Sequence, residues 1–286
     1  MEDKIAILIL AHHNPDQLTT LIEHLSENFI VYVQIDKKST LLISELPKHD
    51  NVFYFKEVNV YWGDYSLVEN MLFVLEKAFK NNHSHYLFIS GDDFPIKPNK
   101  EIIDFLTVNN SNIYMYANPL PIKTWTFNNG FDRVDRYWYM KIKSRNTVKA
   151  INRILLYVQR IFGIKIKRFP IKLYAGSQWL NLTHEALKAV FNFLNSNPEY
   201  LKKLKYSRAT DEMWIQTIIM NNSVLKEKVI NNDLRYIDWE TGPEFPRVLN
   251  ENDEKLLLKS NALFARKFNF NRDKKFINSF LNKLNS

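Results

Sequence analysis

The sequence has no cysteine, and only six of its 286 residues are glycine. Without cysteine the chain can form neither disulfides nor Cys-ligated metal sites, and it has no thiol nucleophile. The six glycines stand too far apart for a glycine-rich phosphate loop or for the G-x-S-x-G turn of many hydrolases. A bound nucleotide must therefore be held by other means.

Long apolar runs are also missing. The longest uninterrupted run covers residues 5–11, whereas a membrane-spanning helix needs about 20 apolar residues. No signal-peptide pattern precedes this run. The balance of 45% hydrophobic and 24% charged residues is typical of a folded protein with a sizeable core. We therefore expect a cytoplasmic protein without a membrane-spanning segment.

The formal net charge of +8 is concentrated in one stretch. Between residues 141 and 172 lie ten lysines and arginines and no aspartate or glutamate. Six apolar residues recur at helical spacing in this stretch: Ile151, Ile154, Leu155, Val158, Ile161 and Phe162. One interpretation is a solvated charged face. The other is a basic amphipathic helix that rests on an anionic membrane, here the inner face of the cell membrane.

The C-terminal segment 269–286 repeats this chemistry. An apolar stripe is formed by Phe276, Ile277, Phe280, Leu281 and Leu284. Lysines and arginines surround the stripe, so the segment is a basic amphipathic tail. Packing against the body of the protein is the favoured interpretation of this stripe.

The apolar pattern of the first hundred residues alternates between strand and helix. It predicts strands over 5–11, 30–35, 52–55 and 85–90, and helices over 16–28 and 66–80. This alternation predicts an α/β fold with a mixed, mostly parallel central sheet flanked by helices. In such sheets ligands bind beyond the carboxyl ends of the strands.

Polar residues cluster where these predicted strands end. The clusters are 12–15, 36–39, 61–64 and 91–95. Any one of these residues could simply cap a helix or close a turn. Because the four clusters converge on one edge of the sheet, we expect Asp36 and Asp93 to face a shared crevice, and the convergence predicts a binding site.

The sequence does not favour a metal site. Asp92 and Asp93 are adjacent, so in an extended segment their side chains point to opposite faces and do not share an ion. His83 and His85 lack a third ligand nearby, which favours a surface position. A diphosphate bound without a metal needs cationic side chains, which directs attention to lysines and arginines of the C-terminal third.

Seven sequence segments follow one another in a recognisable order. They are AHHNP at 11–15, VQIDKKS at 33–39, VYWGDYSLVENML at 60–72, SGDDFPIKPNKEI at 90–102, GSQW at 176–179, DEMWIQTI at 211–218 and LFARKF at 263–268. Together they resemble the core-2/I-branching N-acetylglucosaminyltransferase family, as a bacterial member. That family also includes peptide-O-xylosyltransferases.

The resemblance implies a variant of the GT-A glycosyltransferase fold in a single domain, 1–286. Its nucleotide-binding half would be 1–105 and its acceptor and catalytic half 106–268, followed by the tail 269–286. The implied activity is an inverting, metal-independent transfer from a UDP-sugar, such as UDP-GlcNAc or UDP-xylose, to a glycan acceptor.

The resemblance identifies Glu212 as the catalytic base. Inversion needs a base on the face opposite the leaving diphosphate, and a carboxylate is the usual choice. We expect Thr210 to be an N-cap and Glu212 to lie in the first turn of the following helix, whose dipole keeps the carboxylate ionised. From the residues alone, Asp211 and Glu212 are also explained as acidic residues that merely complement that dipole.

Further site residues are implied by the same resemblance. Lys267 and Arg247 would bind the diphosphate, with Arg266 as the alternative to Arg247. Four residues at the strand ends would surround the donor: His13, Asp36, Tyr61 and Asp93. Five would face the acceptor: Arg133, Arg136, Trp179, Tyr236 and Trp239. Aromatic faces stack on sugars and charged groups bind hydroxyls, although rings also suit a core.

We therefore predict a glycosyltransferase of surface-polysaccharide synthesis that needs no cofactor besides its UDP-sugar donor. A lipid-linked oligosaccharide is one candidate acceptor, and it would give the basic stretches a role at the membrane. The alternative is a catalytically inactive carbohydrate- or nucleotide-binding protein on the same fold. Nucleic-acid binding is disfavoured, because the acidic strand ends would repel phosphates and no recognised nucleic-acid motif is present.

Overall fold

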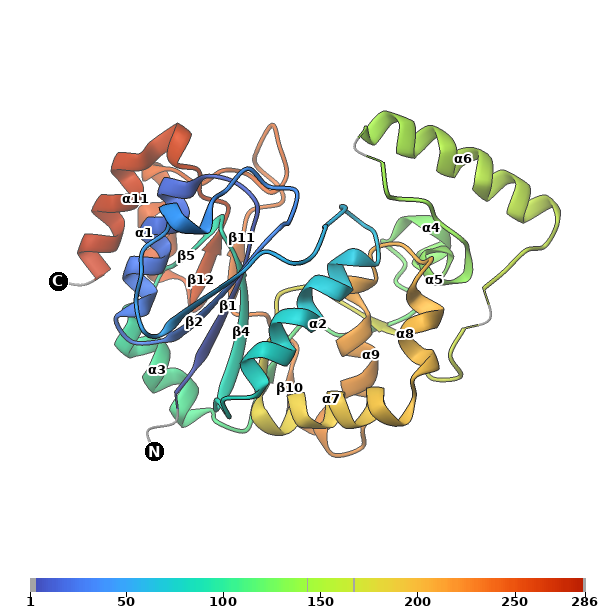
Figure 1. The fold of residues 1–286 in the computed structure, drawn as a ribbon, viewed down its shortest axis with the longest axis horizontal. Helices are drawn as coiled ribbons and strands as arrows, with labels where there is room; N and C mark the ends of the chain where they lie inside the picture. Colours follow the sequence, from blue (N-terminus) through green and yellow to red (C-terminus); the bar gives the residue numbers. More distant parts are fainter. Residues whose placement is uncertain (1–3, 143, 167, 285–286) are drawn as a thin grey trace.

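The computed structural model describes residues 4–142, 144–166 and 168–284. A seven-stranded sheet crosses the protein in the order β10-β6-β9-β4-β1-β2-β3, and helices cover both of its faces (Figure 1). Its parallel part consists of β1 (Ala6–Ala11), β2 (Ile30–Ile35), β3 (Val52–Phe55) and β4 (His85–Ser90). Three of these strands have the predicted bounds, and β1 begins one residue later than predicted.

Beyond β4 the sheet is mixed. Strand β9 (Asn181–Thr183) runs antiparallel to β4 and to β6 (Ile113–Tyr114). Strand β10 (Val229–Ile230) pairs in parallel with β6. The predicted mixed, mostly parallel central sheet is therefore confirmed.

The sheet is buried on both faces, which explains why β1 is a continuous apolar run. Its side chains alternate between two cores: Ile7 and Ile9 pack into one, and Ala6 and Leu8 into the other. The first core is covered by α1 (Pro15–Ser26), α3 (Asn99–Val108) and α11 (Phe270–Leu284). The second is covered by α2 (Ser66–Phe79), α7 (His184–Ser196) and α9 (Trp214–Met220).

A second, three-stranded sheet lies beside the first. Its order is β11 (Arg235–Ile237), β12 (Phe264–Arg266) and β5 (Asp93–Pro95). Because β12 is antiparallel to β5, Arg266 lies opposite Asp93. Further short elements are α4 (Thr126–Asn129), α5 (Asp132–Asp135), α8 (Glu199–Leu204), α10 (Glu254–Lys259), β7 (Asn118–Pro119), β8 (Tyr174–Ala175) and 3₁₀ turns at Ile43–Glu45, Thr210–Glu212, Leu225–Lys228 and Glu251–Asp253.

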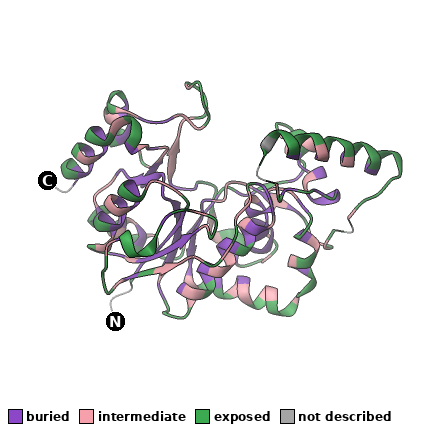
Figure 2. Ribbon diagram, turned by 45° about the horizontal axis from the view of Figure 1, so that its top comes forward, coloured by how far each residue is buried: buried purple, intermediate pink, exposed green. Residues whose placement is uncertain are grey.

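The two basic amphipathic segments have different surroundings. Helix α11 buries its stripe, including Phe276 and Phe280, against the first core, as the sequence predicted. Helix α6 (Arg145–Ile161) instead stands out from the body and is largely exposed (Figures 1 and 2). Within the described ranges, no helix is both long enough and apolar enough to cross a bilayer.

The surface position predicted for His83 and His85 is wrong. Both side chains are buried. His83 Nε2 lies 2.9 Å from the hydroxyl of Tyr32, so a neighbouring strand supplies a polar partner inside the fold. A partner from β2 is a long-range contact that the local sequence does not reveal.

Candidate active site

The carboxyl ends of β1, β2 and β4 meet at one edge of the sheet. The backbone N–H of Asp36 donates to Ala11 C=O at 2.9 Å, and that of Gly91 donates to Leu10 C=O at 3.1 Å. His12 and His13 follow β1, with ring centroids 4.1 Å apart. These contacts confirm that the predicted polar clusters converge.

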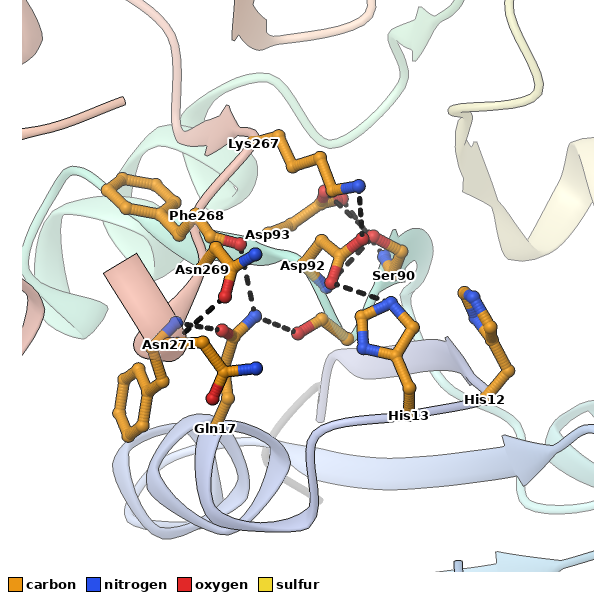
Figure 3. A network of polar contacts seen from close by, with 12 residues as sticks. His12, His13, Gln17, Ser90, Asp92, Asp93, Lys267, Phe268, Asn269 and Asn271 are labelled. Atoms are coloured by element: carbon orange, nitrogen blue, oxygen red, sulfur yellow. Dashed lines mark hydrogen bonds and ion pairs between the residues drawn. The ribbon is translucent and has the colours of Figure 1, made fainter. Parts of the chain in front are cut away.

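Asp92 lies between two basic side chains at this edge (Figure 3). Its carboxylate oxygens lie 3.4 Å from His13 Nε2 and 3.5 Å from Lys267 Nζ. Burial opposes ionisation of Asp92, but the hydrogen bond from His13 and the nearby positive charges outweigh it, so its pKa lies below the usual range. The same hydrogen bond raises the pKa of His13. Asp92 thus holds two potentially cationic groups in place.

Gln17 fixes the position of the Lys267 segment, and sequence reasoning missed it. Its amide nitrogen donates to Gly91 C=O at 2.7 Å and to Phe268 C=O at 3.3 Å. Its amide oxygen accepts from the N–H of Phe270 at 2.8 Å (Figure 3). The one local signal was a polar residue on the apolar face of a predicted helix, because Gln17 is fully buried in α1.

Asp93 does not line the crevice as predicted. It is 0% exposed and forms ion pairs with Arg266 at 2.9 Å and Arg235 at 3.3 Å. The hydroxyl and N–H of Ser90 donate to it as well. Asp93 therefore joins the two sheets beneath the site, whereas Asp92 faces the site, so the two carboxylates diverge as expected.

The predicted role of Arg247 in binding a diphosphate is not supported by its surroundings. Its guanidinium donates to both oxygens of Asp253, at 2.9 and 2.6 Å, and to Asp238 at 2.7 Å. These two carboxylates neutralise the guanidinium and raise its pKa. The alternative, Arg266, is held by Asp93. Of these three basic residues, Lys267 is the one placed beside His13 at the strand edge.

Asp36 and Tyr61 lie together at the end of β2. Lys38 Nζ is 2.9 Å from Asp36 and 4.3 Å above the centre of the Tyr61 ring. The backbone N–H of Val60 also donates to Asp36, at 3.1 Å. These side chains and His12 line one wall of a cavity of about 930 Å³, and α6 supplies part of the opposite wall.

Glu212 lies in the 3₁₀ turn Thr210–Glu212 and is partly exposed. The expected helix start at Thr210 is wrong: α9 begins at Trp214, because Met213, with φ −137°, is not helical and separates the turn from the helix. The carboxylate of Glu212 lies 2.6 Å from Arg133 Nη1. Arg133 was predicted to face the acceptor. In the structure its guanidinium instead pairs with Glu212 and orients that carboxylate.

Two sets of contacts tie Glu212 to the strand edge. Towards the donor strands, the N–H of Ala209 donates to Gly63 C=O at 2.8 Å. Towards Lys267, the N–H of Gly176 donates to Glu212 C=O at 2.9 Å, while the ring of Trp179 lies 4.9 Å from the Arg266 guanidinium. Gly176 and Trp179 are three residues apart, and three residues of extended chain span about 11 Å at most. The loop between them therefore holds the Glu212 segment and the Arg266 segment close together.

Asp211 differs sharply from its neighbour Glu212. Its side chain is buried, and one carboxyl oxygen, Oδ1, has no hydrogen-bond partner. Burial, reinforced by the charge of Glu212, raises the pKa of Asp211 to about 8. Burial therefore favours the protonated form of Asp211.

Arg208 is a second site residue that sequence reasoning missed. It lines the cavity, and its guanidinium lies 5.8, 4.5 and 5.0 Å from the ring centres of Trp62, Phe127 and Trp138. Burial and the charge of Arg133 lower its pKa. In the part of the chain that the structure describes, no carboxylate forms an ion pair with it, so its charge faces the cavity. Its sequence context gave no signal beyond nearness to Glu212.

The residues predicted on the acceptor side are separated by the fold. Arg136 is buried and donates to Gln159 C=O and Ile164 C=O, so it anchors α6 rather than binding a ligand. Trp179 is only 8% exposed, beneath two arginines, and cannot offer a ring face to a sugar. Tyr236 packs on the first core, and Trp239 is 60% exposed in the loop after β11. For Tyr236 and Trp239 the acceptor role stays a prediction.

The acidic and histidine side chains of the described ranges do not gather in threes as a metal site would require. Basic side chains are present instead: His13 and Lys267 beside Asp92, and Arg208 in the lining of the cavity.

Comparison with known proteins places these features in a family. The sequence model of the Core-2/I-Branching enzyme family matches residues 5–256. A xylosyltransferase of Ciona intestinalis is 21% identical over 222 residues, which cover 73% of this chain and 23% of that protein. The β-glucuronosyltransferase GlcAT14A of Arabidopsis thaliana is 28% identical over 99 residues, which cover 34% of this chain and 22% of that protein.

The matched regions of these relatives are parts of much longer proteins, since the chain spans less than a quarter of their length. Among solved structures, a glycosyltransferase involved in glycosylation of the major capsid of PBCV-1 aligns over 98% of both chains with 12% identity. Its TM-score is 0.35, a likeness too weak to carry an argument.

Proposed function

The chain belongs to the Core-2/I-Branching enzyme family, and from this premise we propose that it is an inverting glycosyltransferase. It transfers a sugar from a UDP-sugar to a glycan acceptor during surface-polysaccharide synthesis, without a metal ion. The whole chain forms one GT-A-like catalytic domain, in which 1–105 bind the nucleotide, 106–268 supply the acceptor side and the base, and 269–286 form the tail.

The observation that carries the proposal is the accessible and fixed position of the Glu212 carboxylate. It is partly exposed, fixed by Arg133 at 2.6 Å, and tied by backbone contacts to the strand edge that holds His13 and Lys267. Its neighbour Asp211 is buried, and burial raises the pKa of that carboxyl, which disfavours a second negative charge beside Glu212. A fixed, accessible carboxylate is what general-base catalysis requires.

In the proposed reaction the acceptor hydroxyl loses its proton to Glu212 as its oxygen attacks the anomeric carbon. The bond from that carbon to the UDP oxygen breaks, and its electron pair leaves with the diphosphate. Attack on the face opposite UDP inverts the configuration of the carbon. Arg133 orients the carboxylate of Glu212 through their hydrogen bond.

Negative charge grows on UDP during this step, and fixed cations stabilise it. In this proposal Lys267 and His13, which both contact Asp92, bind the diphosphate, and Arg208 replaces Arg247 in the role that the resemblance implied. Asp36 and Tyr61 would bind uridine, which is supported by their position in the lining of the cavity. A sugar of the kinds named in the relatives, xylose or glucuronic acid, is a candidate alongside GlcNAc.

The direct test is a panel of UDP-sugars incubated with the purified chain, with and without EDTA. We expect UDP release from at least one UDP-sugar that EDTA does not abolish, and an NMR spectrum of the transferred sugar showing the inverted anomer. Retention of configuration, or activity lost with EDTA and restored by manganese, would contradict the proposal. Binding of UDP-sugars without any turnover would favour the inactive binding protein.

A further inference from the structure

Helix α6 has an inner face that the fold covers and an apolar outer face that it leaves exposed. The inner face consists of Val148, Asn152, Leu156 and Gln159, which are buried. Asn152 exchanges hydrogen bonds with the backbone of Tyr139, at 2.8 and 2.9 Å, and Gln159 with that of Tyr137, at 2.7 and 2.9 Å. These paired bonds hold the helix rigidly against the 137–139 segment.

The outer face of α6 remains exposed. Ile154, Tyr157 and Ile161 are 65%, 67% and 60% exposed, and Phe162 just beyond the helix is 73% exposed. With Val158 they recur at three- and four-residue spacing, which places 154, 157, 158 and 161 on one stripe of the helix. Figure 2 shows this helix as almost wholly exposed on the side away from the body.

Basic side chains border this stripe. Lys149, Arg153 and Arg160 are exposed on α6, and the whole stretch 141–172 holds ten basic residues and no acidic ones. Arg160 is held by Asp132 of the body at 2.9 Å, so its charge is partly neutralised. A basic border beside an apolar stripe is the composition of helices that lie in a lipid interface.

We propose that this surface, the outer face of α6, docks on an anionic lipid bilayer with the helix axis parallel to the membrane. Its members are Ile154, Tyr157, Val158, Ile161 and Phe162 with their basic border of Lys149, Arg153 and Arg160. The stripe enters the boundary between headgroups and acyl chains, and the border meets the headgroup phosphates.

Charge complementarity selects the lipid over a second copy of this chain. A symmetric dimer through this face would bring Lys149, Arg153 and Arg160 of both copies together, with no acidic residue of α6 between them. An anionic bilayer removes that repulsion, and each lysine or arginine near such a surface contributes about 1 kcal/mol.

Docking would also place the large cavity at the membrane surface. Lys149, Arg153 and Leu156 of α6 line that cavity, so the helix that meets the lipid is also a wall of the site. An acceptor carried on a lipid anchor would then enter from the bilayer. This consequence rests on the proposed glycosyltransfer, whereas docking itself does not.

The test is co-sedimentation of the full chain with vesicles in the absence of substrate. We expect binding to equimolar phosphatidylcholine and phosphatidylglycerol, binding to phosphatidylcholine alone weaker by at least about tenfold, and loss of the difference near 1 M salt, where screening shortens to about 3 Å. The variant Ile154→Ser/Ile161→Ser should partition onto the anionic vesicles at least about tenfold more weakly than the wild type. It lacks two apolar side chains that would move from water into the lipid interface.

The matched control is Leu256→Ser, a substitution of an equally exposed leucine on α10, which should bind vesicles like the wild type. The double variant should melt like the wild type and keep its transfer rate with a water-soluble acceptor, since it touches neither core nor cavity. Equal binding to both vesicle types, wild-type binding by the double variant, or a dimer that the double variant abolishes would overturn the proposal. Absence of transferase activity would count against the proposed function alone.

Discussion

The structure has two pairs of acidic residues that are adjacent in sequence: Asp92-Asp93 after β4, and Asp211-Glu212 before α9. In each pair one carboxyl has a basic partner at the site: Asp92, which is itself 4% exposed, and Glu212, which is partly exposed. The other carboxyl, Asp93 or Asp211, is buried away from it. The buried members differ. Asp93 is bound by two arginines, whereas Asp211 has an oxygen without a hydrogen-bond partner and a raised pKa.

The difference shows that burial alone does not decide the charge of a carboxyl group. When cations are buried beside a carboxylate, it forms ion pairs, and the ion pairs of Asp93 connect the two sheets. Where they are not, the group keeps its proton, as Asp211 does beside Glu212. In the proposed reaction the other member of this pair, Glu212, is the base.

The largest effect on stability is expected from Asp93→Asn. Removing this charge leaves Arg235, whose side chain is almost fully buried, with its ion pair broken, which costs about 3–5 kcal/mol of unfolding free energy. Asp211→Asn is the matched control at the other buried position, and it should be no less stable than wild type at pH 7. Urea unfolding measures the change in unfolding free energy of both variants. Similar losses in the two would contradict the distinction between Asp93 and Asp211.

A smaller effect is expected when Lys267, the partner of Asp92, is replaced. Lys267→Ala should weaken UDP binding by at least about tenfold, the scale of a lost charge-assisted hydrogen bond. Arg247→Gln is the control, because two aspartates already engage that guanidinium. Its UDP affinity should stay within about threefold of wild type by calorimetry. The reverse ranking would restore the role first predicted for Arg247.

The smallest effect is a pH-dependent difference in stability. The folded-state pKa of Asp211 is raised, so between about 4 and about 8 the folded protein keeps a proton that the unfolded chain releases. Stability from this group is thus complete below pH 4 and falls as pH rises. Asp211→Asn should gain on the order of 1 kcal/mol over wild type between pH 6 and pH 7. A constant difference would show that Asp211 is ionised in both states.

The sequence predicted what depends on neighbours along the chain. Strands and helices of the first hundred residues had nearly correct bounds, because apolar periodicity reports which face is buried. The convergence of polar strand ends followed from parallel pairing alone.

Residues were misassigned where distant partners decide their role. The guanidinium of Arg136 donates to the backbone near the end of α6, and that of Arg247 forms ion pairs with Asp238 and Asp253. No local pattern shows such partners. Both α6 and α11 are basic and amphipathic, yet the body covers the apolar stripe of α11 and leaves that of α6 exposed. The start of α9 was misplaced because residue preference does not show that Met213 adopts a non-helical conformation.

The central claim is that Glu212 is the base and its protonated neighbour is not. The most direct measurement is the single-turnover transfer rate of Glu212→Gln and Asp211→Asn from the same UDP-sugar, with UDP affinity measured alongside. Glu212→Gln should lower the rate by about 100-fold or more with UDP affinity unchanged, and Asp211→Asn should stay within about threefold of wild type. Wild-type transfer by Glu212→Gln, or an equal loss in Asp211→Asn, would contradict the claim.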